Sequence, residues 1–371
     1  MPAIFAYKEI IFIIHGNNKY IIAMKKILFC GGGSAGHVIP NIALIEQLPE
    51  YEVFYMGTGA IEENICKINK IKFYRFDAVK LVRGKLLCNL AIPFKLIKSI
   101  KQAGKILDEI KPDLLFCKGG YVCIPPAFAA KKRKIPIIAH ESDIEAGLAN
   151  KLIASKCEKM LTAFPTTASK FKNGKFAGTP MRKNLFGRDK NEAKRNLGID
   201  PSRPTVIVFG GGSGSKIIND NLRKIAFEIC KKVNILHLCG KGNKVDTNIY
   251  GYKQIEFAED MGEVYACADY AVARCGSNSA FELIALKIPT LFIPLENKSS
   301  RGDQVKNAEY FHKAGLCSVL KERDLTPETL KNGIAELICN NEIKTALEKS
   351  NFKCGNDAIK TEVAHTLRQL S

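Results

Sequence analysis

The sequence predicts an α/β protein built from two doubly wound domains with parallel sheets. The same unit, an apolar strand that turns through glycines into a helix, occurs twice, with its glycine loops at residues 31–36 and 210–215. Short apolar runs alternate with helical patterns after each loop, as in parallel sheets connected by crossover helices. A chain of 371 residues also exceeds one ordinary hydrophobic core and suits two domains.

The first half contains a series of apolar runs of strand length with helical patterns between them. One helical pattern covers residues 143–155, for which Asp143 is a suitable N-cap. The expected strands are residues 25–30, 51–56, 71–76, 113–117, 135–139 and 159–163.

Residues 173–204 are rich in glycine and proline and mark a domain boundary, after which the pattern restarts. The expected strands there are 205–209, 233–238, 270–273 and 290–293, and the expected helices are 215–231, 277–286, 304–313 and a helical tail from 326. We therefore divide the chain into an N-terminal extension (1–23), an N-terminal domain (24–180), a C-terminal domain (181–355) and a C-terminal helix (356–371). Two such domains facing each other place a ligand cleft at the carboxyl ends of both sheets.

The composition narrows the class of protein. Thirteen cysteines lie mostly in apolar runs, with no C-x-x-C pair, which indicates reduced core thiols of a cytosolic protein. The sequence has no apolar run of about 18 residues that could span a bilayer, and residues 1–23 lack the pattern of a signal peptide. A net charge of +19 points to an anionic partner: a nucleic acid, a nucleotide or an acidic membrane surface. The absence of tryptophan and of basic–aromatic interleaving disfavours a base-stacking platform.

A strand that turns through glycines into a helix can present backbone N–H groups to a phosphate. Gly31, Gly33 and Gly36 match the dinucleotide fingerprint, but the acid that would hold the ribose is missing, since Glu52 lies at the wrong end of the second strand. A nicotinamide-dependent dehydrogenase is therefore disfavoured. The chain has neither a P-loop nor a D-x-D metal anchor. We expect no metal and no cofactor, with helix termini and cationic side chains neutralising any diphosphate.

Five motifs in both halves of the chain carry a resemblance to a known family. They are Gly32-Gly33-Ser34-Ala35-Gly36-His37-Val38-x-Pro40, Lys118-Gly119-Gly120-Tyr121-Val122, His140-Glu141-Ser142-Asp143, Gly178-Thr179-Pro180-Met181-Arg182, and Arg274-Cys275-Gly276-Ser277 through Glu282. In this order they resemble the MurG family, which transfers N-acetylglucosamine from UDP-N-acetylglucosamine to lipid I in peptidoglycan synthesis. The resemblance implies the GT-B fold of two Rossmann-like domains, inversion at the anomeric carbon, lipid II as product, and a peripheral enzyme at the cytoplasmic face of the inner membrane.

The resemblance also implies roles for individual residues. Ser34, Ala35 and Gly36 correspond to the loop at the sugar and diphosphate, and Arg182 corresponds to an arginine at the donor. A guanidinium suits that place because it stays charged and binds two oxygens at once. The implied acceptor-side residues are Gly119, Gly120 and Tyr121, and the implied donor-side residues are Gly212, Ser213, Ala258 at the uracil, Ser277, Asn278, Ser279, Glu282 at the ribose and Gln304 at the sugar.

The chain departs from the family pattern at two places. In the second glycine loop, Gly212 stands where the family has a serine, and Ser213 comes one position later. Whether the Ser213 hydroxyl makes the contact of the family's serine is left open. Asp143 stands where many members carry asparagine. A negative charge beside a diphosphate is costly unless it is paired, so Asp143 either serves the acceptor side or caps its helix.

Three residues are candidates for the catalytic base: His37, with His140 and Glu141 as alternatives. His37 follows the first glycine loop at the start of a helix. A helix N-terminus disfavours imidazolium, which keeps a histidine neutral and able to accept a proton. We therefore favour His37, the other interpretation being that it only hydrogen-bonds the sugar or the loop.

Residues 75–111 hold nine basic and three acidic residues, a net charge of +6, interleaved with Leu86, Leu87, Ile92 and Phe94. The segment is either a contact with an anionic membrane surface or an amphipathic helix that packs on the sheet.

Rival functions for the whole chain are a UDP-sugar 2-epimerase or another GT-B transferase, and a basic nucleic-acid-binding protein with salt-dependent affinity. We expect UDP-N-acetylglucosamine, lipid I and the membrane surface as partners, and no nucleic acid.

Overall fold

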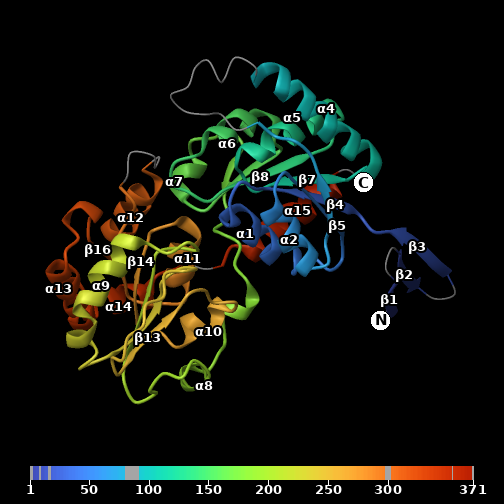
Figure 1. Cartoon of the computed structure of the whole chain (residues 1–371). Coiled ribbons are helices and arrows are strands. Elements are labelled where there is room, and N and C mark those ends of the chain that lie inside the picture. Colours follow the sequence, from blue (N-terminus) through green and yellow to red (C-terminus); the bar gives the residue numbers. More distant parts are fainter. Residues whose placement is uncertain are drawn as a thin grey trace. The chain divides into compact units, whose positions relative to one another are not determined.

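The computed structural model describes residues 3–7, 10–15, 18–79, 92–296, 302–352 and 354–369 (Figure 1). It divides into two compact units, one made of Met1–Arg182 with Cys354–Ser371 and the other of Lys183–Lys353. Each unit contains one fully parallel sheet, as the strand–helix alternation predicts. No described helix is both long and apolar enough to cross a membrane.

The sheet of the first unit has seven strands in the order β10-β9-β8-β7-β4-β5-β6. Its strands are β4 (Lys26–Cys30), β5 (Glu52–Gly57), β6 (Lys72–Arg75), β7 (Leu114–Cys117), β8 (Ile137–Glu141), β9 (Lys159–Thr162) and β10 (Gly174–Phe176). Its helices are α1 (Ala35–Ile45), α2 (Ala60–Ile68), α4 (Ile92–Ile110), α5 (Ile124–Lys132), α6 (Leu148–Ile153), α7 (Pro165–Ala168) and α15 (Asn356–Arg368).

Alternate residues of the central strand β4 face opposite layers of helices, because successive side chains of a strand point to opposite faces. Leu28 and Cys30 pack in one core with residues of α4, α5 and α6. Ile27 and Phe29 pack in a second core with residues of α1, α2 and α15. The C-terminal helix α15 therefore completes the core of the first unit, across the sheet from α4 and α5 (Figure 1).

The sheet of the second unit has six strands in the order β13-β12-β11-β14-β15-β16. Its strands are β11 (Thr205–Phe209), β12 (Asn234–Leu238), β13 (Tyr252–Ile255), β14 (Tyr270–Ala273), β15 (Thr290–Phe292) and β16 (Ser318–Val319). Its helices are α8 (Lys190–Asn196), α9 (Lys216–Ile229), α10 (Met261–Ala266), α11 (Ser277–Ala285), α12 (Asp303–Lys313), α13 (Pro327–Cys339) and α14 (Asn341–Lys349).

The expected strands are present, with ends within two residues of the predicted ones. The prediction of a helix over 143–155 capped by Asp143 is wrong, because α6 begins only at Leu148, with Gly147 as its N-cap. The Glu141 carboxylate accepts the N–H groups of Asp143 at 3.0 Å and Gly147 at 2.8 Å and folds the intervening residues into a turn.

The tail from residue 326 is helical, but it consists of three separate helices, α13, α14 and α15. The sequence pattern does not predict the short strands β10, β13 and β16. They lack the continuous run of buried residues that marks equally short strands such as β7 and β15. The first residues form three strands, β1 (Ala3–Tyr7), β2 (Ile10–His15) and β3 (Asn18–Ala23), which pair antiparallel with one another as a separate sheet. That they are an extension outside the fold remains our prediction.

Candidate active site

The strand order reverses beside the first strand of each parallel sheet. In the first unit β4 lies between β5 and β7, and in the second β11 lies between β12 and β14. Ligands of doubly wound folds bind at the carboxyl ends of the strands at such a switch point. The two glycine loops leave β4 and β11 at these points, so each unit carries a candidate ligand edge.

The first glycine loop is held by a carboxylate that the sequence gave no reason to single out. The N–H of Gly33 donates to Oε1 of Glu62 on α2 at 3.1 Å, and Glu62 is only 3% exposed. A Cβ at Gly32 would lie 2.1 Å from the same oxygen. The Gly33 N–H is therefore occupied by a protein carboxylate, while Ser34 and Gly36, further along the loop, lie exposed.

A second loop, which leaves β7, packs against the first. Gly119 and Gly120 have φ values of +105° and +83°, which L side chains rarely adopt. A Cβ at Gly120 would lie 2.7 Å from the Gly32 carbonyl oxygen and 3.2 Å from Cδ2 of His37. The ring of Tyr121 packs against Gly33, where a Cβ would lie 2.9 Å from Cε1 of the tyrosine. The structure thus brings the predicted acceptor-side residues together with His37.

His37 lies in the first turn of α1, and its N–H donates to the Ser34 carbonyl at 3.1 Å. Its side chain is half-buried. His140, by contrast, is 0% exposed, and its Nε2–H donates to the Gly178 carbonyl at 2.7 Å. Burial, and after it the neighbouring Lys118 ammonium, hold the pKa of His140 well below its usual range. His140 is therefore a neutral side chain that ties β8 to the loop after β10.

Glu141 organises the turn that follows β8. Its carboxylate accepts Nδ2–H of Asn150 at 2.9 Å in addition to the N–H groups of Asp143 and Gly147. Burial, and then the nearby Asp143, raise the pKa of Glu141. Three donors on one buried carboxylate indicate that Glu141 holds the position of Asp143, which is itself half-buried.

Lys118 belongs to a motif noted in the sequence, yet no role was predicted for it. It follows β7 directly, is 1% exposed, and its ammonium donates to the Ser142 hydroxyl. Burial lowers the pKa of Lys118 to about 8, although Glu141 and Asp143 act to raise it. A buried lysine at the ligand edge of the sheet is chemically unusual.

Arg182 ends the first unit, and its neighbour Met181 is fixed by a residue from the C-terminal tail. The Met181 N–H donates to Oδ1 of Asn356 at 3.0 Å, and Nδ2 of Asn356 donates to the Met181 carbonyl at 2.7 Å. The Arg182 side chain is half-buried, and its Nε has no hydrogen-bond partner among the described residues. No local sequence signal points to Asn356, which lies 175 positions from Met181.

The second glycine loop has its exposed tip at Gly212 and Ser213, with Gly211 and Gly214 in positive φ on either side. Arg274 opens the last of the five sequence motifs, yet no role was predicted for it; it follows β14 and organises this edge of the second unit. Its Nη1 donates to the Ile293 carbonyl at 3.0 Å, and its Nη2 donates to the Ser215 hydroxyl at 2.9 Å. Arg274 also ion-pairs with Glu322, which follows β16, so it ties three strand ends together.

The predicted donor residues Ser277, Asn278, Ser279 and Glu282 lie on α11, which begins just after β14. Oε2 of Glu282 accepts the Tyr265 hydroxyl at 2.8 Å, and this bond orients the carboxylate. Oε1 of Gln304, on α12, accepts the Leu295 N–H at 3.1 Å. Ala258 lies in the loop after β13.

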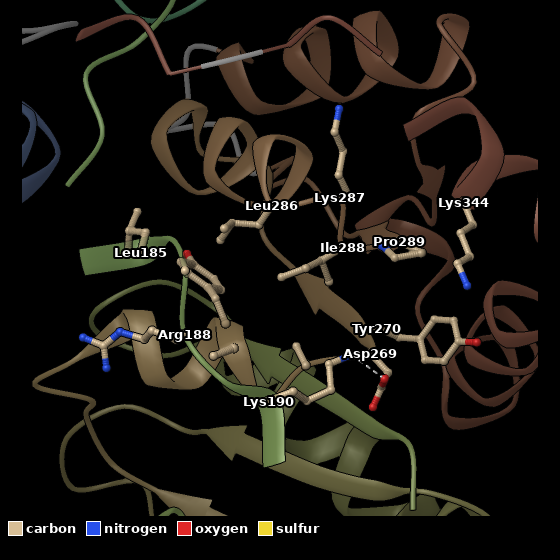
Figure 2. A pocket seen from close by; sticks show the side chains of 14 residues that line it. Leu185, Arg188, Lys190, Asp269, Tyr270, Leu286, Lys287, Ile288, Pro289 and Lys344 are labelled. Atoms are coloured by element: carbon tan, nitrogen blue, oxygen red, sulfur yellow. Dashed lines mark hydrogen bonds and ion pairs between the residues drawn. The ribbon is translucent and has the colours of Figure 1, made fainter. Parts of the chain in front are cut away.

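A cavity of about 300 Å³ lies elsewhere in the second unit (Figure 2). It is lined by residues at the amino ends of β14 and β15, among them Asp269, Tyr270 and Pro289. Asp269 pairs there with Lys190 at 2.7 Å. The cavity therefore lies at the sheet edge opposite to the one that carries the glycine loop.

Within the described residues, no group of three or more histidine, cysteine, aspartate or glutamate side chains could hold a metal ion.

Two family models match the chain: the glycosyltransferase family 28 N-terminal domain over residues 27–162 and the C-terminal domain of the same family over residues 205–364. The chain belongs to glycosyltransferase family 28. Its glycine loops and the five motifs all lie within this family's two domains or between them.

Curated members of this family resemble the chain over most of its length. The UDP-N-acetylglucosamine–N-acetylmuramyl-(pentapeptide) pyrophosphoryl-undecaprenol N-acetylglucosamine transferase of Clostridium kluyveri is 45% identical, covering 85% of this chain and 91% of its own. The transferase of the same name from Clostridium botulinum is 41% identical, covering 93% of this chain and 99% of its own.

Solved structures of family-28 and related enzymes share the fold. The MurG crystal structure from Acinetobacter baumannii matches with a TM-score of 0.70 at 22% identity, over 91% of this chain and 99% of that one. The UDP-GlcNAc 2-epimerase of Neisseria meningitidis matches with a TM-score of 0.63 at 14% identity, over 93% of this chain and 100% of that one. These likenesses confirm the predicted GT-B fold, and the family assignment separates this chain from the epimerase alternative.

Proposed function

We propose that this family-28 chain transfers N-acetylglucosamine from UDP-N-acetylglucosamine to the C4 hydroxyl of the N-acetylmuramoyl unit of lipid I, giving lipid II. The observation that carries the proposal is 45% identity, over 85% of the chain, to a transferase named for this reaction. The reaction forms a bond from the C4 oxygen to the anomeric carbon and breaks the bond from that carbon to UDP. Attack opposite to the leaving group inverts the anomeric centre.

The donor is assigned to the second unit. The exposed loop tip at Gly212 and Ser213 and the N-terminus of α11 supply N–H groups and hydroxyls for the diphosphate. Glu282, oriented by the Tyr265 hydroxyl, accepts hydrogen bonds from the ribose. Arg182, whose buried Nε has no hydrogen-bond partner among the described residues, supplies positive charge as UDP leaves.

The acceptor is assigned to the first unit, with His37 as the base. Of the three candidates, His140 is fully buried with its Nε2–H engaged, and Glu141 already accepts three N–H groups. His37 alone is half-buried beside the loops that carry Ser34 and Gly120. It takes the proton of the C4 hydroxyl as the new bond forms.

Membrane association at the first unit is part of the proposal. The start of α4 exposes Phe94 (78%) and Ile97 (54%), and Lys95, Lys98 and Lys101 on the same helix are also exposed. Apolar side chains surrounded by cations suit an anionic lipid surface. Leu86 and Leu87, also predicted for this contact, lie outside the described residues. The second half of α4 packs on the sheet through Ala103 and Leu107, which confirms the packing interpretation for that half, and the membrane contact at the start of the helix is our proposal.

The experiment that tests the function is an assay of UDP release from UDP-N-acetylglucosamine, with and without a lipid I analogue. We expect release only with the acceptor, and a disaccharide product with inverted anomeric configuration. Turnover of the donor without any acceptor, or epimerised UDP-sugar as product, would contradict the proposal.

A further inference from the structure

We propose that Asn356, at the start of the C-terminal helix α15, positions Arg182 for the transfer by fixing the residue directly before it. Asn356 is then a positioning residue, which acts on the reaction only through Arg182. The inference rests on the proposed function, in which Arg182 supplies positive charge as UDP leaves. It adds to that function a residue that lies outside all five sequence motifs.

Asn356 holds Met181 by both of its backbone polar groups. Oδ1 of Asn356 accepts the Met181 N–H at 3.0 Å, and Nδ2 donates to the Met181 carbonyl at 2.7 Å. The two residues are only 5% and 1% exposed, so water does not compete for these bonds. The two bonds fix the peptide planes on either side of Met181, and the second plane contains the backbone nitrogen of Arg182. Asn356 therefore sets the direction in which Arg182 leaves the clamp.

The residues before Asn356 extend the same contact along the backbone. Thr179 and Cys354 form a parallel bridge, and the Gly355 N–H donates to the Thr179 carbonyl at 2.8 Å. A Cβ at Gly355 would lie 2.4 Å from the Ala177 carbonyl oxygen, so the two segments pack closely. The tail thus runs alongside the motif that ends in the arginine.

Arg182 itself carries the observation that points to a ligand. Its side chain is half-buried, and its buried Nε has no hydrogen-bond partner among the described residues. A buried donor without an acceptor costs free energy, and an oxygen of the substrate would remove that cost. A guanidinium binds two oxygens in one fixed geometry, so a small error in its direction weakens the interaction. A clamp on the preceding residue meets this requirement.

The docking of α15 does not account for Asn356. Three apolar side chains of the helix lie in the core that it shares with α1 and α2, namely Ile359, Val363 and Leu367. Glu362 of the same helix ion-pairs with Lys175 at 2.6 Å. The helix should therefore stay in place without the Asn356 amide, and what is lost is the hold on Met181.

The test is a double-mutant cycle with UDP-N-acetylglucosamine and a lipid I analogue. Asn356→Ala is made in the wild type and in Arg182→Ala, and kcat and both KM values are measured in all four proteins. We expect Asn356→Ala to lower kcat about 10- to 100-fold when residue 182 is arginine, and by no more than about twofold when it is alanine. Both KM values should change less than about threefold, because the interaction develops as UDP leaves. Equal kcat penalties in both backgrounds, or a loss confined to KM, would overturn the proposal.

Two further variants separate positioning from the stability of the helix. Glu362→Gln removes the ion pair with Lys175 and leaves the clamp intact, and we expect its kcat to stay within about twofold of wild type. Asn356→Asp keeps the oxygen that accepts the Met181 N–H but turns an acceptor-only group to the Met181 carbonyl. It tests the clamp even if the alanine variant does not fold, and we expect it to lower kcat by more than about threefold.

Two results with these variants would refute the proposal: a loss of kcat in Glu362→Gln as large as that of Asn356→Ala, or a wild-type kcat in Asn356→Asp. If the wild-type chain does not use the lipid acceptor at all, the proposed function fails first. That outcome is distinct from equal penalties in an active enzyme.

Discussion

Replacing Lys118 with methionine should stabilise the protein at neutral pH. Burial lowers the pKa of this lysine from 10.5 to about 8, and one pKa unit corresponds to about 1.4 kcal/mol. The protonated lysine therefore destabilises the folded state by up to about 3 kcal/mol below pH 8. Methionine removes this term but also loses the hydrogen bond to Ser142, worth about 1 kcal/mol. The net gain at pH 7 is about 2 kcal/mol.

The stability difference between Lys118→Met and the wild type should depend on pH, and its direction follows from the lowered pKa of Lys118. Because the folded pKa lies below the unfolded one, the unfolded wild type binds more protons between pH 8 and 10.5, so wild-type stability rises through that window. The methionine variant has no such rise. Its advantage should therefore be full at pH 7 and shrink to nothing by pH 10. For a unit of this size, 2 kcal/mol corresponds to about 4–8 °C in Tm.

The assay is calorimetric unfolding of the wild type and the variant at pH 7 and at pH 10, compared at each pH so that other ionisations cancel. Lys194→Met is the matched control, because Lys194 is also buried but ion-pairs with Asp269 at 3.1 Å. We expect the control to lower Tm at pH 7. A gain for Lys118→Met that is equal at both pH values, or a loss at pH 7, would refute the reasoning.

Three further predictions concern the proposed reaction and the membrane. His37→Ala should lower kcat by about 10²–10⁴-fold with little change in donor affinity, which steady-state kinetics measures. Glu282→Ala should weaken UDP binding in calorimetry by about 1–3 kcal/mol, since the ribose loses a charged hydrogen-bond partner. The double variant Phe94→Glu and Ile97→Glu should reduce co-sedimentation with anionic vesicles and spare activity on a soluble acceptor. The control Phe227→Glu, at a position in the second unit that is 64% exposed, should change neither vesicle binding nor activity.

Each of these predictions has an outcome that contradicts it. A His37→Ala enzyme that keeps more than about a tenth of wild-type kcat would remove His37 as the base. UDP affinity within about twofold of wild type in folded Glu282→Ala would remove the ribose assignment, and Glu282→Gln, which keeps an oxygen for the Tyr265 hydroxyl, controls for structural loss. Unchanged vesicle binding in the double variant would leave α4 with its packing role alone.

The sequence by itself determined the fold class, the family and the approximate position of most strands. Apolar runs such as residues 205–209 and the glycine loops at 31–36 and 210–215 are local signals, because backbone conformation and burial on both faces act over a few neighbouring residues. The same signals failed for very short strands without fully buried residues, such as β10 and β16. They also failed where a side chain holds a turn in place of the expected helix start, as Glu141 does before α6.

Only the tertiary structure decided which single side chains support the candidate site. Glu62 reaches Gly33 across 29 positions, and Asn356 reaches Met181 across 175. The burial of His140, which favours His37 as the base, follows from the layers packed on both sides of β8. Lys118 meets Ser142 only because β7 and β8 are neighbours in the sheet. Contacts between residues so far apart leave no periodic pattern and no fixed spacing in the sequence, because the packing of the whole chain determines them.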